Sequence, residues 1–146
     1  MNKPVLAILT QSIRRDNQAP IKYFQKFRPV HFYLEAPYGD LTEEELQGAI
    51  KFDGLGDLWR KIKEVKPALI QGTDPFGSKK QLLLAFAIYF ISRFLRIPFF
   101  FAEWENRPVK ERFGLLAPLI RFFLGFLGRK AALVFAINQG AARNLR

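Results

Sequence analysis

The amino-acid sequence predicts an α/β domain built on a parallel β-sheet that helices cover on both faces. Five short apolar runs alternate with segments of helical character along the chain. Strands that are apolar throughout are typical of parallel sheets buried on both faces. The 146 residues, of which 49% are hydrophobic, are enough for one domain with a substantial core. No internal repeat or low-complexity linker divides the chain, so we expect a single domain over residues 1–146.

The strands are predicted from apolar runs bounded by turn residues. We expect them at Val5–Thr10, 30–35, 68–72, 97–102 and 131–137. In parallel sheets, ligands bind beyond the carboxyl ends of the strands. A site is therefore expected in the segments that follow four of these strands: the loop after Thr10, TDPFG after Gly72, EWENRP after Ala102 and NQGAA after Ile137.

The helices are predicted from residue spacing and capping signals. Thr42 stands three residues before Glu45, which is the spacing of a capping box. The clearest helix is Lys79–Leu95, which is apolar nearly all round. Arg93 and Arg96 lie near its C-terminal end, where they suit the helix dipole. We expect helices at 21–27, from residue 42 onward, at 57–65, at Lys79–Leu95, at 113–127 with an interruption at Pro118, and at 140–145.

The segment EWENRP holds the densest group of candidate site residues. Glu103 and Glu105 can accept hydrogen bonds from sugar hydroxyls or act as a base, and Asn106 can both donate and accept. Arg107 can hold a phosphate group in a bidentate fork, and the Trp104 ring offers a stacking face. The alternative is that Glu105 and Arg107 form a surface ion pair while Trp104 fills the core. The position after a parallel strand favours a functional role.

Two further candidates follow neighbouring strands. Asp74 lies just before a predicted helix, so it can cap that helix or bind a hydroxyl group, and the capping role is the more common one. Gly140 lies at the start of the last predicted helix. Free backbone N–H groups at such a position form a candidate site for an anion or a hydroxyl group.

Composition and motifs exclude several kinds of site. The chain has no cysteine, which excludes disulfides, thiolate metal sites and cysteine nucleophiles, and His31 is the single histidine. The segment TQSIRRDNQAP after the first strand has no glycine, so it is neither a dinucleotide-binding fingerprint nor a P-loop. No zinc motif and no GxSxG motif is found.

The charge balance predicts an anionic partner. The net charge is +10, from 23 Lys and Arg residues against 13 Asp and Glu residues, which favours nucleic acid, a phosphorylated substrate or anionic lipid. Nucleic acid is the least favoured of these, because the charge is spread out and no aromatic–basic platform motif is present. The apolar part of MNKPVLAILT is too short for a signal peptide, and the absence of cysteine fits a reducing compartment. We therefore expect a cytoplasmic protein.

Residues 113–128 have more apolar surface than a helix on a sheet requires. The segment is shorter than the about 20 apolar residues of a spanning helix, and packing on a sheet uses one apolar face. The surplus face, which includes Phe122 and Phe126, then meets another domain, a protein partner or the interfacial zone of a bilayer. Because Arg129 and Lys130 follow it, we expect these four residues to contact an anionic membrane surface. Burial against a missing domain is the alternative.

The ordered series KPALIQGTDPF, helix, RIPFFFAEWENRP, helix, AALVFAINQGAARNL resembles the N-terminal domain of GT-B glycosyltransferases. It is similar to the large retaining family, of group 1 or family 4 type, that includes sucrose synthases and phosphatidylinositol mannosyltransferases. The resemblance covers residues 66–146. Glu103, Glu105 and Asn106 match the members with an acidic residue followed by Asn, and Gly140 matches the turn after the next strand. Many members carry a histidine at the strand end where this chain has AEWEN.

The resemblance implies a protein of two Rossmann-like domains. The N-terminal one binds the acceptor, and the C-terminal one, which this chain lacks, binds the nucleotide-sugar donor. The chain would then be the acceptor-binding half of a hexosyltransferase, inactive without the donor domain, with no metal and no cofactor. The expected acceptor is a glycan or a lipid-linked sugar at the cytoplasmic face of a membrane.

The resemblance also gives the candidate residues roles in that reaction. Glu103 and Glu105 would be catalytic, whereas the substrate would be bound by Asn106, Arg107, Asp74 and Gly140. The alternative function is a non-catalytic membrane-docking subunit that recruits a separate donor-binding partner.

Overall fold

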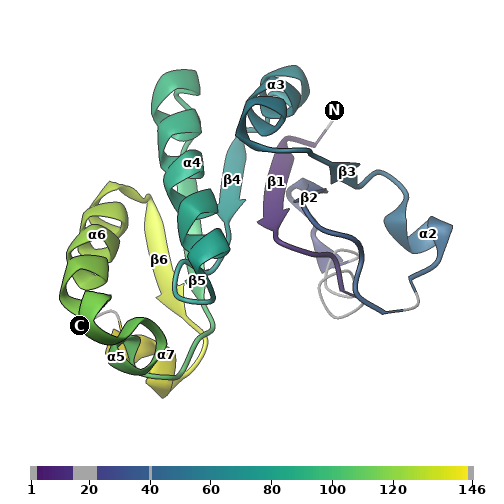
Figure 1. The fold of residues 1–146 in the computed structure, drawn as a ribbon. Helices are drawn as coiled ribbons and strands as arrows, with labels where there is room; N and C mark the ends of the chain where they lie inside the picture. The colour runs from purple at the N-terminus through teal and green to yellow at the C-terminus, as the bar shows by residue number, and fades with distance from the viewer. Residues whose placement is uncertain (1–2, 15–22, 40, 145–146) are drawn as a thin grey trace. The chain divides into compact units, whose positions relative to one another are not determined.

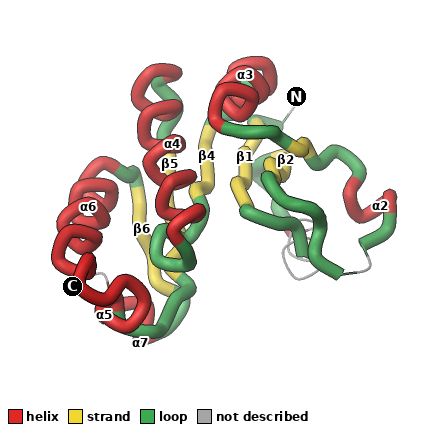
Figure 2. Tube along the Cα trace, in the orientation of Figure 1, coloured by secondary structure: helices red, strands yellow, loops and turns green. Residues whose placement is uncertain are grey.

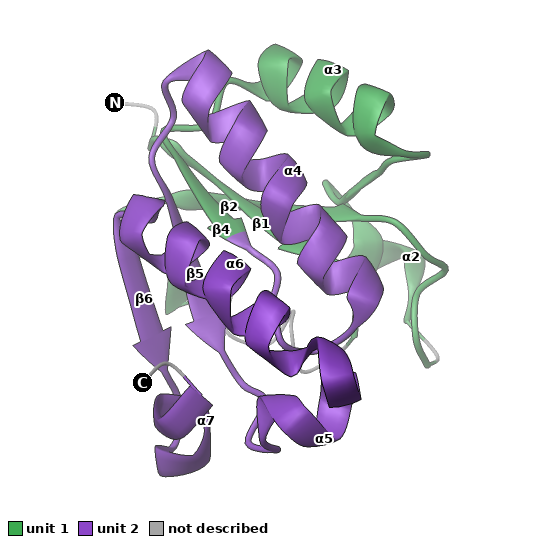
Figure 3. Ribbon diagram, turned by 60° about the vertical axis from the view of Figure 1, so that its left-hand side comes forward, with its two compact units in different colours: residues 1–71 green, residues 72–146 purple. Residues whose placement is uncertain are grey.

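The computed structural model describes residues 3–14, 23–39 and 41–144 and confirms the predicted α/β class. Six strands form an all-parallel, Rossmann-like sheet in the order β3-β2-β1-β4-β5-β6. The chain falls into two compact units, residues 1–71 and 72–146 (Figure 3).

The first unit contains the amino-terminal strands and two helices. Its strands are β1 (Val5–Thr10), β2 (Arg28–Tyr33), β3 (Ile50–Lys51) and most of β4 (Leu69–Gly72), and its helices are α2 (Glu43–Leu46) and α3 (Leu55–Val65). The central strand β1 pairs in parallel with β2 and β4, and its apolar residues Leu6, Ala7, Ile8 and Leu9 are all buried. This burial on both faces explains why β1 reads as a continuous apolar run.

In the first unit, local sequence signals predict the start of α2 but not the edge strand β3. The capping box is present as expected: Thr42 accepts from the Glu45 N–H, and the Glu45 carboxylate accepts from the Thr42 N–H. Strand β3 was missed because two residues are too few to show a pattern. The helix predicted at 21–27 lies partly outside the described residues, and residues 23–27 form no α-helix.

The second unit contains the remaining elements. They are α4 (Lys79–Leu95), β5 (Phe99–Glu103), α5 (Val109–Phe113), the short 3₁₀ turn η2 (Gly114–Leu116), α6 (Ala117–Lys130), β6 (Leu133–Ala136) and α7 (Gln139–Asn144). Strands β5 and β6 pair in parallel, with Phe101 opposite Val134. Helices α4 and α6 lie side by side against these strands, and α5 and α7 lie beyond the carboxyl ends of the strands (Figures 1 and 2).

The helix predicted at 113–127 is divided at a different residue from the one expected. Gly114 has a φ of 55°, which ends α5, and α6 starts at Ala117. Pro118 therefore lies in the first turn of α6. Backbone N–H groups in the first turn have no partner within the helix, so proline, which has no N–H, costs no hydrogen bond there. The proline helps to start this helix and does not interrupt it.

Gly72 ends β4 at a point where no side chain fits. A Cβ atom added there would lie 2.3 Å from Cε1 of Phe101, a ring that is fully buried. The glycine thus allows the backbone at residue 72 to approach the Phe101 ring within the second unit.

We predict that Gly72→Ala lowers the free energy of unfolding by about 1–3 kcal/mol, because the buried ring must move. The matched control is Gly125→Ala in α6, where the nearest atom to an added Cβ is 3.7 Å away and belongs to the flexible Arg129 side chain. That change should stabilise the protein by about 0.5–1 kcal/mol, since alanine favours a helix interior. Chemical denaturation measures both values. Equal effects of the two variants would contradict the close approach at Gly72.

Candidate functional site

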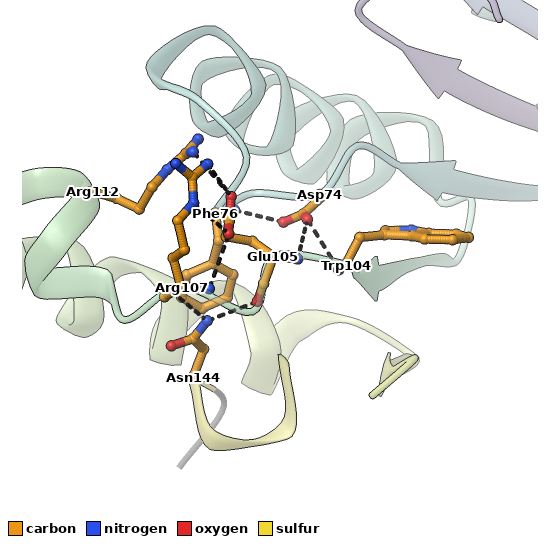
Figure 4. Close-up of polar contacts among 7 residues, drawn as sticks. All are labelled: Asp74, Phe76, Trp104, Glu105, Arg107, Arg112 and Asn144. Carbon is orange, nitrogen blue, oxygen red and sulfur yellow. Dashed lines mark hydrogen bonds and ion pairs between the residues drawn. The ribbon is translucent and has the colours of Figure 1, made fainter. Parts of the chain in front are cut away.

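The polar residues that follow β4, β5 and β6 in the second unit form one cluster (Figure 4). It is made of the turn after β4, the segment EWENRP after β5, and helix α7 after β6. Hydrogen bonds that span 30 to 39 residues of sequence join these three segments. The expected site at the carboxyl ends of the strands is therefore a connected structure with several interlocking contacts.

Asp74 is the centre of this cluster. Its Oδ1 accepts a hydrogen bond from the Phe76 N–H at 2.8 Å, which shapes the turn before α4. Its Oδ2 accepts from the N–H groups of Trp104 and Glu105, both at 3.0 Å. One carboxylate thus holds the start of EWENRP against the end of β4. The helix cap itself comes from Ser78, which accepts from the Gln81 N–H.

Glu105 is tied down by two arginines. Its oxygens accept from Arg107 Nε at 3.0 Å and Arg107 Nη2 at 2.9 Å, and Arg112 Nη1 lies 3.0 Å away. Its side chain is only 11% exposed. Partial burial acts to raise the pKa of Glu105, but the hydrogen bonds and charge of Arg107 outweigh it and lower the pKa below the ordinary value. Glu105 is therefore an ionised, well-partnered carboxylate.

Helix α7 is attached to the same loop from the other side. Asn144 Nδ2 donates to the backbone oxygens of Glu105 at 2.9 Å and Arg107 at 3.0 Å. Asn138 caps the helix by accepting from the Ala141 N–H at 2.8 Å. A Cβ added to Gly140 would lie 2.7 Å from Cβ of Asn106, so the absence of a side chain there lets α7 pack against the loop.

Glu103 lies at the end of β5 with no access to solvent. It is 0% exposed, and neither carboxyl oxygen has a hydrogen-bond partner among the described residues. Burial, together with the neighbouring charge of Asp74, raises its pKa to about 10. Glu103 is therefore neutral at physiological pH and sits beneath the loop, out of reach of a ligand on the surface.

Three side chains of the loop that can bind a ligand face solvent. Trp104 is 56% exposed, Asn106 is exposed, and the Arg107 side chain is 57% exposed although it pairs with Glu105. The alternative in which Trp104 fills the core does not hold, whereas the ion pair between Glu105 and Arg107 is present. An aromatic face, an amide and a guanidinium are thus presented together on a fixed loop.

The structure separates the predicted site residues into two places. Asp74, Glu103, Glu105, Asn106, Arg107 and Gly140 all belong to the polar cluster. The four predicted membrane contacts lie on or at the end of α6: Phe122 is exposed, Arg129 and Lys130 are exposed, and Phe126 is half-buried with its ring centre 5.2 Å from that of Tyr89.

Sequence reasoning missed three residues that hold the cluster together. Arg112 and Asn144 reach Glu105 and the loop backbone only through the tertiary fold, and no spacing rule connects them. Asn138 was detectable, since an asparagine within two residues of the start of a predicted helix is a candidate N-cap, and it lies directly before α7.

The described residues contain neither a metal-binding group nor a membrane-spanning helix. Within the described ranges, no group of three or more His, Asp or Glu side chains could hold a metal ion. None of the helices in this part of the chain combines the length and apolar character needed to cross a bilayer.

Comparison with known proteins assigns no family. No protein-family model matches the chain, and no curated protein matches it. The resemblance to glycosyltransferases therefore stays a prediction from motifs. What the structure shows is the parallel, Rossmann-like α/β fold.

We predict that Glu103 makes the protein less stable as pH rises. Above about pH 4.5 the unfolded chain loses this proton, while the folded chain keeps it up to about pH 10, so the free energy of unfolding falls through that range, by at most about 1.4 kcal/mol per pH unit. Glu103→Gln stays neutral at every pH, so its advantage over the parent protein should grow between about pH 5 and pH 9.

Urea denaturation at a series of pH values measures this effect. The control is Glu64→Gln, because Glu64 is an exposed carboxylate on α3 that pairs with Arg60 at 3.1 Å. If Glu103→Gln and the parent protein share one pH profile, Glu103 is not a buried neutral acid.

We also predict that Asp74→Ala loosens the loop. Three backbone N–H groups lose their acceptor, which should cost about 2 kcal/mol of stability and expose the Trp104 and Glu105 amides to solvent exchange. Hydrogen exchange followed by NMR measures the protection of these two amides. Asp53→Ala, which removes an exposed carboxylate 3.9 Å from Lys51, should leave both stability and protection unchanged.

Proposed function

We propose that this chain is the acceptor-binding domain of a glycosyltransferase that moves a sugar from a nucleotide-sugar to a glycan or a lipid-linked acceptor at the cytoplasmic face of a membrane. The observation that carries the proposal is the fixed loop after β5, which presents Trp104, Asn106 and Arg107 to solvent at the carboxyl end of a parallel strand. Ligands of open α/β sheets bind at this edge.

The three exposed side chains suit a sugar that carries an anionic group. The face of an aromatic ring can pack on the apolar C–H face of a sugar ring. The Asn106 amide can donate to one hydroxyl and accept from another. Arg107 Nε and Nη2 donate to the Glu105 carboxylate, and the remaining N–H groups of this exposed guanidinium can donate to the phosphate of a lipid-linked or phosphorylated sugar.

In this proposal the carboxylates have positioning roles. Asp74 fixes the loop backbone, and Glu105 orients Arg107 while Arg112 balances the charge. Glu103 is buried beneath them and acts through the packing of the loop. The resemblance suggests a catalytic role for Glu103 and Glu105, but their burial and partners favour support of the ligand-binding residues. The nucleotide-sugar would be held by a second Rossmann-like domain, and the proposal includes no metal, cofactor or nucleic acid.

A second candidate is a non-catalytic docking subunit of the same fold that recruits a separate donor-binding partner. The observation that favours it is the exposed apolar side chains of α6, which are not part of the polar cluster. The two candidates differ in one measurable property: only the acceptor-binding domain should bind a soluble sugar through the loop after β5.

We predict saturable binding of a soluble acceptor analogue, such as a short-chain alkyl phosphate-linked hexose, measured by calorimetric titration. Trp104→Ala, Asn106→Ala and Arg107→Ala should each raise the dissociation constant about tenfold. This is the loss of affinity expected when one polar or stacking contact is removed. Binding should also change the fluorescence of Trp104, which is exposed.

The matched control is Arg60→Ala. Arg60 pairs with a carboxylate as Arg107 does, and its side chain is 61% exposed against 57% for Arg107. Its removal should leave binding unchanged. Binding that none of the three loop variants weakens would contradict the proposed site, and a panel of hexose, pentose and amino-sugar analogues without any binder would contradict the function.

A further inference from the structure

The outer surfaces of α4 and α6 are apolar and exposed. On α4, the exposed residues recur along one side of the helix, and on α6 and the turn before it they do the same. Six of them, with exposed fractions from 52% for Leu119 to 100% for Leu115, are Leu83, Phe90 and Phe94 on α4, and Leu115, Leu119 and Phe122 on η2 and α6; Leu116 and Phe123 on η2 and α6 are exposed as well. We call the first six residues the outer apolar surface.

Aromatic contacts join the two halves of this surface. The rings of Phe86 and Phe123 meet edge to face at 5.5 Å, and those of Tyr89 and Phe126 meet at 5.2 Å. These pairs pack in the interface between α4 and α6, which lie side by side (Figure 3). The exposed residues on the two sides of this interface therefore form one broad surface, and Phe126 packs beneath it against Tyr89.

The charge of the two helices is of one sign. Neither α4 nor α6 contains an Asp or Glu residue, although α4 starts with Lys79 and Lys80 and α6 ends with Arg129 and Lys130. Residues 72–146 hold 12 Lys and Arg against four Asp and Glu, so they carry +8 of the net charge of +10. Lysines at the start of a helix oppose its dipole. Helix stability therefore accounts for Arg129 and Lys130 at the end of α6 but not for Lys79 and Lys80, which an anionic partner would explain.

A small cavity lies between the C-terminal ends of the two helices. Its volume is about 130 Å³, and it is lined by Tyr89, Ser92, Arg93, Phe99 and Lys130. Arg93 and Lys130 have no carboxylate partner among the described residues. Two cations around a cavity of this size, next to exposed Phe90 and Phe94, match the arrangement expected where a phosphate group meets the apolar part of a lipid layer.

We propose that the outer apolar surface lies on an anionic bilayer, with Arg93 and Lys130 binding the phosphate of a lipid headgroup. The six apolar residues enter the interfacial zone, and the cations meet the headgroups. This inference deepens the membrane part of the proposed function, yet none of its residues belongs to the polar cluster.

Charge decides between a bilayer and a second copy of this chain. If two copies met through this surface, cationic helices would face each other without a carboxylate on either side, which opposes association. An anionic bilayer offers both the apolar layer and the opposite charge that the surface lacks. The proposal therefore commits to lipid.

Vesicle co-sedimentation tests the proposal. We expect binding to vesicles of phosphatidylcholine with about one third phosphatidylglycerol, and little binding to phosphatidylcholine alone. Leu83→Ser/Leu119→Ser should weaken binding about tenfold through lost apolar insertion. Arg93→Gln/Lys130→Gln should weaken it by a similar factor, about tenfold, through lost headgroup contacts.

Each double variant has a matched control. Leu55→Ser/Leu133→Ser changes two leucines that are also exposed, at 44% and 57%, but lie on α3 and β6. Lys26→Gln/Lys63→Gln removes the same charge from exposed positions outside both helices. Both controls should bind vesicles like the parent protein. Circular dichroism checks that all variants are folded.

A fluorescent reporter measures insertion directly. In Phe90→Trp the emission should shift to the blue when anionic vesicles are added, whereas in Leu133→Trp it should not. No binding, binding that the controls weaken equally, or a concentration-dependent dimer that Leu83→Ser/Leu119→Ser abolishes would each overturn the proposal. Arg107→Ala should leave vesicle binding intact, and Leu83→Ser/Leu119→Ser should leave binding of a soluble sugar intact, so the two proposals fail independently.

Discussion

The candidate site depends on one interaction, the Asp74 carboxylate with the backbone of the next strand's loop. This one carboxylate accepts hydrogen bonds from three backbone N–H groups, those of Phe76, Trp104 and Glu105. Without it, the Trp104 and Glu105 amides would lose their acceptor, and the loop would have no fixed starting point. The contacts of Glu105 with Arg107 and of Asn144 with the loop backbone all build on a position that Asp74 sets.

The charge of the cluster depends on which of its carboxyl groups is buried. Burial, and after it the neighbouring charge of Asp74, raises the pKa of Glu103 to about 10 and keeps it neutral. Glu105 is negative, and Arg107 with Arg112 carries two positive charges. The five groups therefore sum to about zero, which favours recognition of hydroxyl groups by hydrogen bonds, with Arg107 as the one exposed place for an anionic group.

The strands β1 and β5 and the helices α2 and α4 could be predicted because their signals are local: apolar runs for β1, β5 and α4, and a capping box for α2. The division between α5 and α6 could not, because the effect of Pro118 depends on where the helix starts, and the positive φ of Gly114 sets that start. The burial of Glu103 had a readable signal, since it follows Phe99 and Phe101 at every second residue and so shares their buried face. The partners of Glu105 had none, because they come from the tertiary fold.

The two proposals also constrain each other through the direction of the chain. Helices that follow parallel strands run opposite to them, so Arg93 at the end of α4 and Lys130 at the end of α6 lie far from the polar cluster. A helix of 17 residues is about 25 Å long, so headgroup contacts at one end alone would leave the cluster far from the bilayer. Leu115, fully exposed on η2 just after α5, extends the apolar surface to the end where the cluster lies. A domain docked by the whole surface would lie with α4 and α6 along the membrane plane, and a lipid-linked acceptor would then reach Arg107 from the side of η2.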